Sequence, residues 1–162
     1  HGDARYELNK LADDVKFDLV FGDAFHDISI PEHLVTQEFN DLVARRLHDD
    51  GVYLVNVVDN AKRPLFLLSY VKTLQRSFDR VEVWFEPDPR QQGRRTTYIV
   101  VGANTPLEDD FINAENGFER SWWRWPNTKL VSASANQQLP ILTDDRAPVD
   151  KLMSGLLLGN VR

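Results

Sequence analysis

The chain has 162 residues, a length typical of one domain, and its 42% hydrophobic and 27% charged residues are ordinary for a folded protein. A net charge of −6 argues against a nucleic-acid-binding surface, and the absence of cysteine excludes disulfides, thiolate catalysis and cysteine-bound zinc. The four histidines have no metal-ligand spacing, and the longest apolar runs are too short to cross a bilayer. We therefore expect a soluble domain without a metal.

The first half of the chain alternates helical and strand patterns. Asp3 is placed to cap a first helix, Gly51 to end a second, and Pro64 to start a third. Apolar runs between these helices are typical of strands that are buried on both faces. The predicted elements are, in order, a helix over 4–13, a strand over 18–21, a helix over 37–49, a strand over 52–58 and a helix over 64–77.

The second half begins with a different pattern. Residues 81–85 and 97–101 read as two strands joined by a loop, and we predict that they pair as an antiparallel hairpin. Helices that alternate with buried strands and end in such a hairpin indicate the second half of a doubly wound α/β domain. Further along, the chain predicts a helix over 107–124, a loop over 127–139 and a final helix over 149–158.

Tryptophans gather just before Pro126, at positions 122, 123 and 125. We interpret this cluster as a lid over exposed core or a subunit contact, in preference to a cage for a ligand.

Acidic residues follow the ends of the two predicted parallel strands. Asp23 is the first polar group after residues 18–21, and Asp59 follows residues 52–58. In open α/β sheets, ligands bind at this carboxyl edge. A simpler reading is that such an acid only caps the next helix. Several acids around one cleft would suit an amine, because an ammonium group needs compensating charge and a nucleophilic amine needs a base.

Five motifs carry a more specific signal. They are Gly-Asp-Ala-Arg at 2–5, the run from Phe17 to Phe39 that includes Phe-Gly-Asp-Ala-Phe-His-Asp, Asp-Gly-Val-Tyr at 50–53, Asn-Val at 56–57, and Leu-Thr-Asp-Asp-Arg-Ala-Pro-Val at 142–149. Together these motifs resemble the spermidine-synthase-like proteins, most closely the bacterial branch that is often fused behind a membrane transporter-like region. The resemblance covers residues 1 to about 105 and returns at 141–155.

The resemblance implies a class I methyltransferase-type fold that transfers an aminopropyl group from decarboxylated S-adenosylmethionine to a diamine such as putrescine. Asp3, with Ala4, matches the loop that binds the cofactor's adenine. Asp23 matches the acid that acts as base on the attacking amine. Typical synthases have a second acid three residues later, where this chain has His26, so Asp27 is the expected amine anchor; we add Asp59 as a second substrate-binding candidate.

In the family, the glycine-rich cofactor turn precedes the residue that matches His1, so we expect this chain alone to be inactive. We expect residues 1–105 to form the carboxyl-terminal half of a nucleotide-binding domain and residues 106–162 its helical or irregular extension. The expected fold class is α/β, a partial Rossmann-like sheet of the methyltransferase type with an antiparallel hairpin and peripheral helices.

We expect the chain to be a cytoplasmic homodimer, with polyamine substrates, no nucleic-acid partner and no membrane contact of its own. The parent protein could still be tethered to a membrane through an upstream region. The alternatives are a methyltransferase that acts on another nucleophile and a non-catalytic lobe that serves as a structural or partner-binding module.

Overall fold

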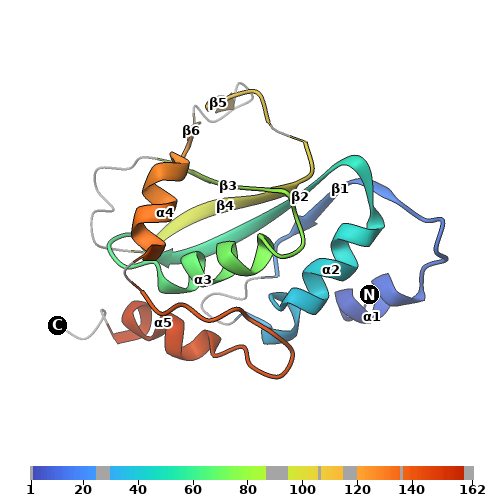
Figure 1. Ribbon diagram of the computed structural model, residues 1–162, viewed down its shortest axis with the longest axis horizontal. Helices are drawn as coiled ribbons and strands as arrows, with labels where there is room; N and C mark the ends of the chain where they lie inside the picture. The colour runs from blue at the N-terminus through green and yellow to red at the C-terminus, as the bar shows by residue number, and fades with distance from the viewer. Residues whose placement is uncertain are drawn as a thin grey trace.

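The computed structural model describes residues 2–24, 30–86, 95–105, 107–114, 120–135 and 137–158. These residues form a six-stranded sheet with helices packed against one side (Figure 1). None of the helices described is long and apolar enough to cross a membrane. In chain order the elements are α1 (Ala4–Lys10), β1 (Phe17–Gly22), η1 (Glu32–Leu34), α2 (Gln37–Arg46), β2 (Leu47–Asn60), α3 (Leu65–Leu74), β3 (Arg80–Phe85), β4 (Arg95–Ala103), β5 (Phe111–Ala114), β6 (Arg120–Arg124), α4 (Asn127–Ala135) and α5 (Val149–Leu158).

The strand order is β1-β2-β4-β3-β6-β5. β1 pairs with β2 in parallel, and α2 forms the crossover between them. β4 lies between β2 and β3 and is antiparallel to both. The predicted parallel pair and the predicted antiparallel hairpin are therefore both confirmed, and the fold is α/β as expected.

The core lies between the sheet and the helices α2, α3 and α5 (Figure 1). Along β2, every second residue from Gly51 to Asp59 is buried, while the residues between them are only half-buried. This period of two means that one face of the strand packs against the helices and the other is more open. α3 is the most deeply buried helix, and its Phe66, Leu67 and Tyr70 are fully enclosed.

The boundary between α2 and β2 differs from the prediction. The helix ends at Arg46, three residues early, because Leu47 is buried and pairs with Phe17 of β1. Gly51, which we expected to end the helix, lies inside β2 instead. A Cβ there would lie 2.9 Å from the Phe17 carbonyl oxygen, so the close approach of the two strands requires glycine.

Two predictions about the region after residue 106 are wrong. The predicted helix over 107–124 contains the strands β5 and β6, which pair so that Phe111 lies opposite Trp123 with ring centroids 4.6 Å apart. Such aromatic cross-strand pairs favour strands over a helix. The predicted loop over 127–139 contains α4, whose Leu130 is buried although the segment around it is largely polar.

β1 lies at the edge of the sheet, with no described strand on its outer side, and its Leu19 and Phe21 are 55% and 57% exposed. An apolar strand edge is a template for pairing with another chain. We expect the 162-residue chain to form a dimer through this edge. Sedimentation measures the dimer, and Leu19→Lys or Phe21→Lys should shift the equilibrium toward the monomer. A monodisperse monomer would contradict this expectation.

Candidate functional site

A cavity of about 250 Å³ lies at the carboxyl end of β1, where the sheet meets α1 and the segment from Ile30 to Phe39. Most of its lining is apolar, and Asp23 is the acid among the lining residues. The lining residues are Ala4, Leu8, Val20, Phe21, Gly22, Asp23, Ala24, Ile30, Leu34, Val35, Phe39, Tyr53 and Val55. The cavity therefore brings together Ala4 and Asp23, two of the residues singled out in the sequence.

Asp23 is exposed at the rim, and a neighbouring strand fixes its carboxylate. Gly22 lies opposite Val55 in the parallel pair, which brings Asn56 of β2 beside Asp23. The Asn56 Nδ2 atom donates a hydrogen bond to the Asp23 Oδ1 atom over 2.9 Å. A carboxylate can only accept, so the Asn56 amide must present its nitrogen to Asp23. Within the described part of the chain, the Asn56 Oδ1 atom is buried and has no hydrogen-bond partner.

The backbone at Gly22 passes close to a buried tyrosine. A Cβ at this position would lie 3.2 Å from the hydroxyl oxygen of Tyr53. A larger residue at position 22 would press on Tyr53, which is itself part of the cavity wall. Burial raises the pKa of Tyr53 to about 12, so this hydroxyl stays neutral at physiological pH.

Asp3 caps α1 as predicted and lies beside the cavity. Its Oδ1 atom accepts a hydrogen bond from the Tyr6 backbone N–H over 2.9 Å, and its Oδ2 atom lies 2.5 Å from the His33 Nε2 atom. The bond from Tyr6 and then the bond to His33 lower the pKa of Asp3. The Asp3 carboxylate is thus an ionised hydrogen-bond acceptor one residue before Ala4. A ligand group that binds this carboxylate must share it with His33.

Asp59, one of the predicted substrate residues, does not line this cavity. Asp59 is 1% exposed, and its carboxylate accepts hydrogen bonds from the backbone N–H groups of Asn60 (2.7 Å) and Leu67 (2.9 Å). Burial raises the pKa of Asp59 to about 6. The hydrogen bond from Leu67 caps the first turn of α3. A role of Asp59 in substrate binding stays a prediction. Asp27 lies outside the described residues.

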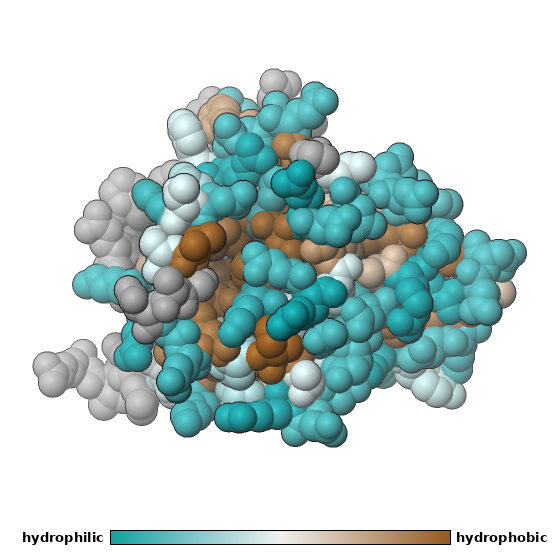
Figure 2. Space-filling model, viewed as in Figure 1, coloured by the Kyte–Doolittle hydropathy of each residue, from teal (hydrophilic) through white to brown (hydrophobic). Residues whose placement is uncertain are grey.

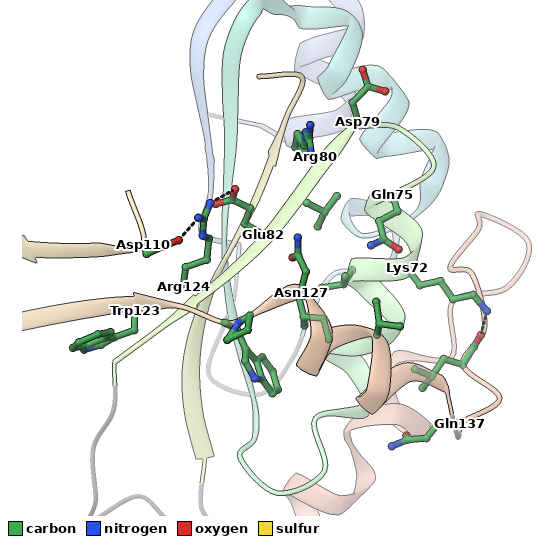
Figure 3. Close-up of a pocket in the computed structure, with 17 residues that line it drawn as sticks. Lys72, Gln75, Asp79, Arg80, Glu82, Asp110, Trp123, Arg124, Asn127 and Gln137 are labelled. Carbon is green, nitrogen blue, oxygen red and sulfur yellow. Dashed lines mark hydrogen bonds and ion pairs between the residues drawn. The ribbon is translucent and has the colours of Figure 1, made fainter. Parts of the chain in front are cut away.

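A second cavity of about 920 Å³ lies between α3, α4 and the start of β3 (Figure 3). Apolar side chains gather on this side of the molecule and are surrounded by hydrophilic surface (Figure 2). Arg124 crosses one wall of the cavity, donating to Glu82 over 2.9 Å and to Asp110. The four predicted site residues that the structure describes, Asp3, Ala4, Asp23 and Asp59, do not line it.

Two residues of the tryptophan cluster pack against other aromatic rings. Trp125 stacks on Tyr98 with ring centroids 6.1 Å apart and contacts Phe85. Trp123 is exposed by about half and packs on Phe111. The contacts of Trp125 agree with the interpretation of the cluster as a cover for the core.

Comparison with known proteins supports the fold. No protein-family model and no curated protein sequence matches the chain. A probable spermidine synthase from Corynebacterium glutamicum is similar in structure, with a TM-score of 0.67 and 18% identity over 91% of this chain and 54% of that one. MnmC2 from Aquifex aeolicus is similar with a TM-score of 0.53 and 22% identity over 96% of this chain and 42% of that one.

The chain therefore has a partial methyltransferase-like α/β fold. It spans about half the length of each of these two structures.

Proposed function

We propose that the complete protein is a transferase of the spermidine synthase type, which moves an aminopropyl group from decarboxylated S-adenosylmethionine to a diamine such as putrescine. The observation that carries the proposal is the cavity shared by Ala4 and Asp23 at the carboxyl edge of the sheet. The fold likeness to a spermidine synthase, and the motifs at 2–5 and 17–39, support the same function. Asp3 and Ala4 are proposed to contact the nucleoside, and Asp23 the amine.

The reaction requires one proton transfer. The amine nitrogen attacks the aminopropyl carbon bonded to the sulfonium sulfur, the carbon–sulfur bond breaks, and methylthioadenosine leaves with the bond's electron pair. The attacking nitrogen gives up a proton, which Asp23 can accept because it lies at the cavity rim, free of any cation among the described residues. Asn56 donates to one oxygen of Asp23, and this bond orients the carboxylate.

A second candidate is methyl transfer from S-adenosylmethionine to another nucleophile. The same fold and the same contacts from Asp3 and Ala4 would serve that cofactor. The presence of His26 where typical synthases have a second acid favours this candidate, because amine anchoring then depends on Asp27. Asp27 and Asp59 remain proposed substrate-binding residues under the first candidate.

Binding of methylthioadenosine to the complete protein, measured by calorimetry, tests the nucleoside contacts. We expect Ala4→Leu to weaken binding by at least about tenfold, because the added carbons enter the cavity that Ala4 lines. Asp3→Asn should also weaken the binding of methylthioadenosine. Asparagine is as good an N-cap as aspartate, so α1 should still begin at Ala4.

Asp18→Asn is the matched control, because Asp18 is an exposed acid of β1 that does not line the cavity. Unchanged affinity in both Ala4→Leu and Asp3→Asn would contradict the proposed site.

A further inference from the structure

The Thr-Asp-Asp-Arg motif forms a tight turn that reaches the start of the chain. Thr143 and Arg146 exchange two backbone hydrogen bonds, which places Asp144 and Asp145 at the tip. Asp144 binds the Arg5 guanidinium with both carboxylate oxygens, at 2.7 and 2.5 Å, across 139 positions of the sequence. This fork-to-fork geometry is the strongest form of such a pair. Asp145 is exposed, and it makes no ion pair with any residue that the structure describes.

Asp144 also holds the start of α2. Its backbone N–H donates to the Glu38 Oε2 atom over 3.0 Å. Two residues before Asp144, the Leu142 carbonyl accepts a hydrogen bond from the Gln37 N–H over 2.8 Å. In Figure 1 the segment that leads to α5 passes beside the start of α2. One acidic residue therefore contacts two separate elements, α1 and α2.

These two elements form the walls of the cavity that face the sheet. Ala4 and Leu8 come from α1, while Leu34, Val35 and Phe39 come from the segment that leads into α2 and its first turn. α1 has seven residues, and none of them is buried. A helix this short is marginal without tertiary contacts, so its polar contacts, together with the packing of Leu8 against the core, determine where it lies.

We propose that Asp144 is a positioning residue, which through Arg5 holds α1, and with it Ala4 and Asp3, at the separation from α2 that the nucleoside requires. The identity of the ligand rests on the proposed function, whereas the effect on α1 does not. Arg5 and Asp144 are 25% and 40% exposed, and pairs this exposed add little to global stability. The pair therefore acts on the placement of one helix.

Hydrogen exchange of the α1 amides in the 162-residue chain tests this position directly. We expect Asp144→Asn to speed exchange in α1 by about tenfold and to leave β2 and β4 unchanged, since the charged fork is lost. Asp145→Asn, at the neighbouring position of the same turn, should match the wild type. The double variant Arg5→Asp with Asp144→Arg restores an ion pair and should recover part of the protection.

If Asp144→Asn unfolds the chain, as judged by a thermal melt, Asp144→Glu provides a milder variant that keeps the charge and shifts the fork. Equal α1 exchange in the Asp144 and Asp145 variants would overturn the proposal.

The affinity of the complete protein for methylthioadenosine tests whether the position of α1 affects nucleoside binding. Asp144→Asn should weaken binding by about tenfold and leave turnover at saturating co-substrate near the wild-type value, whereas Asp145→Asn should change neither. Normal affinity together with fast α1 exchange would overturn the link. If the wild type itself does not bind methylthioadenosine, the proposed function fails, and the exchange rates still decide whether Asp144 positions α1.

Discussion

Replacing Asp23 by asparagine in the complete protein should lower turnover by about 10²- to 10⁴-fold, the usual contribution of a general base. A diamine is almost wholly protonated at neutral pH, so transfer needs an acceptor for the proton of the attacking nitrogen. Asparagine keeps the size and shape of the side chain but removes its charge and basicity. Binding of methylthioadenosine should stay nearly unchanged, because it depends on Asp3, Ala4 and other nucleoside contacts.

Steady-state kinetics checks this prediction, with Asp18→Asn as the matched control, because that variant removes an exposed carboxylate from β1, the strand that Asp23 follows. Near-normal turnover in Asp23→Asn would mean that Asp23 has only a structural role at the end of β1.

Asp27→Asn should instead raise the apparent Michaelis constant for the amine, because Asp27 is proposed to anchor the substrate and not to act as the base.

The second large effect concerns stability and pH. Burial raises the pKa of Asp59 from 3.8 to about 6, so between these values the folded chain binds a proton that the unfolded chain has lost. The stability contributed by Asp59 is therefore fully present below about pH 4 and is lost as the pH rises through about 6. The loss corresponds to about 3 kcal/mol, from a shift of about two pKa units.

Urea unfolding of the wild type and of Asp59→Asn at pH 4 and pH 7 measures this effect. The quantity compared is the difference in free energy of unfolding between the two proteins at each pH. Asparagine keeps an oxygen for the Leu67 N–H, so the variant retains this α3 cap without the buried charge. We expect the variant to gain about 3 kcal/mol relative to the wild type as the pH rises from 4 to 7. Asp50→Asn controls for the removal of an exposed carboxylate from β2, and a difference that does not change with pH would contradict the account.

Sequence patterns predicted the sheet best where burial alone decides the structure. β1 and β2 are apolar runs, and α3 and α5 are apolar helices, so their positions follow from the sequence pattern. The expected burial of both strands on two faces is wrong: one face of β2 is only half-buried, and Leu19 and Phe21 of β1 are exposed. The α2–β2 boundary was missed because the contact between Leu47 and Phe17, which ends the helix, joins residues 30 positions apart.

The region after residue 106 was misjudged for a related reason. β6 forms because Trp84 and Phe85 of β3 pair with Arg124 and Trp123, and no local pattern reports such a neighbour. α4 packs against the rest of the fold through Leu130. One buried apolar side chain does not give the sequence of this segment a helical hydrophobic period.

In the candidate site, the resemblance assigned expected roles to Asp3, Ala4 and Asp23 but none to the residues that contact them, although these residues also lie in the motifs. Asn56 beside Asp23, His33 beside Asp3, and Asp144 beside Arg5 are all contacts between distant parts of the chain. The motif at 142–149 marked the position of Asp144, although its spacing gives no information on its partner. Asp59 looked like Asp23 in the sequence, as both follow a buried strand, and only the structure shows that its oxygens accept backbone N–H groups around α3.

Product analysis by mass spectrometry tests the central claim most directly. The complete protein is incubated with putrescine and decarboxylated S-adenosylmethionine, and in parallel with putrescine and S-adenosylmethionine. We predict that spermidine and methylthioadenosine form together in the first mixture, that Asp18→Asn retains this activity, and that Asp23→Asn nearly abolishes it. A methylated product from the second mixture without spermidine in the first, or no product in either, would contradict aminopropyl transfer at this site.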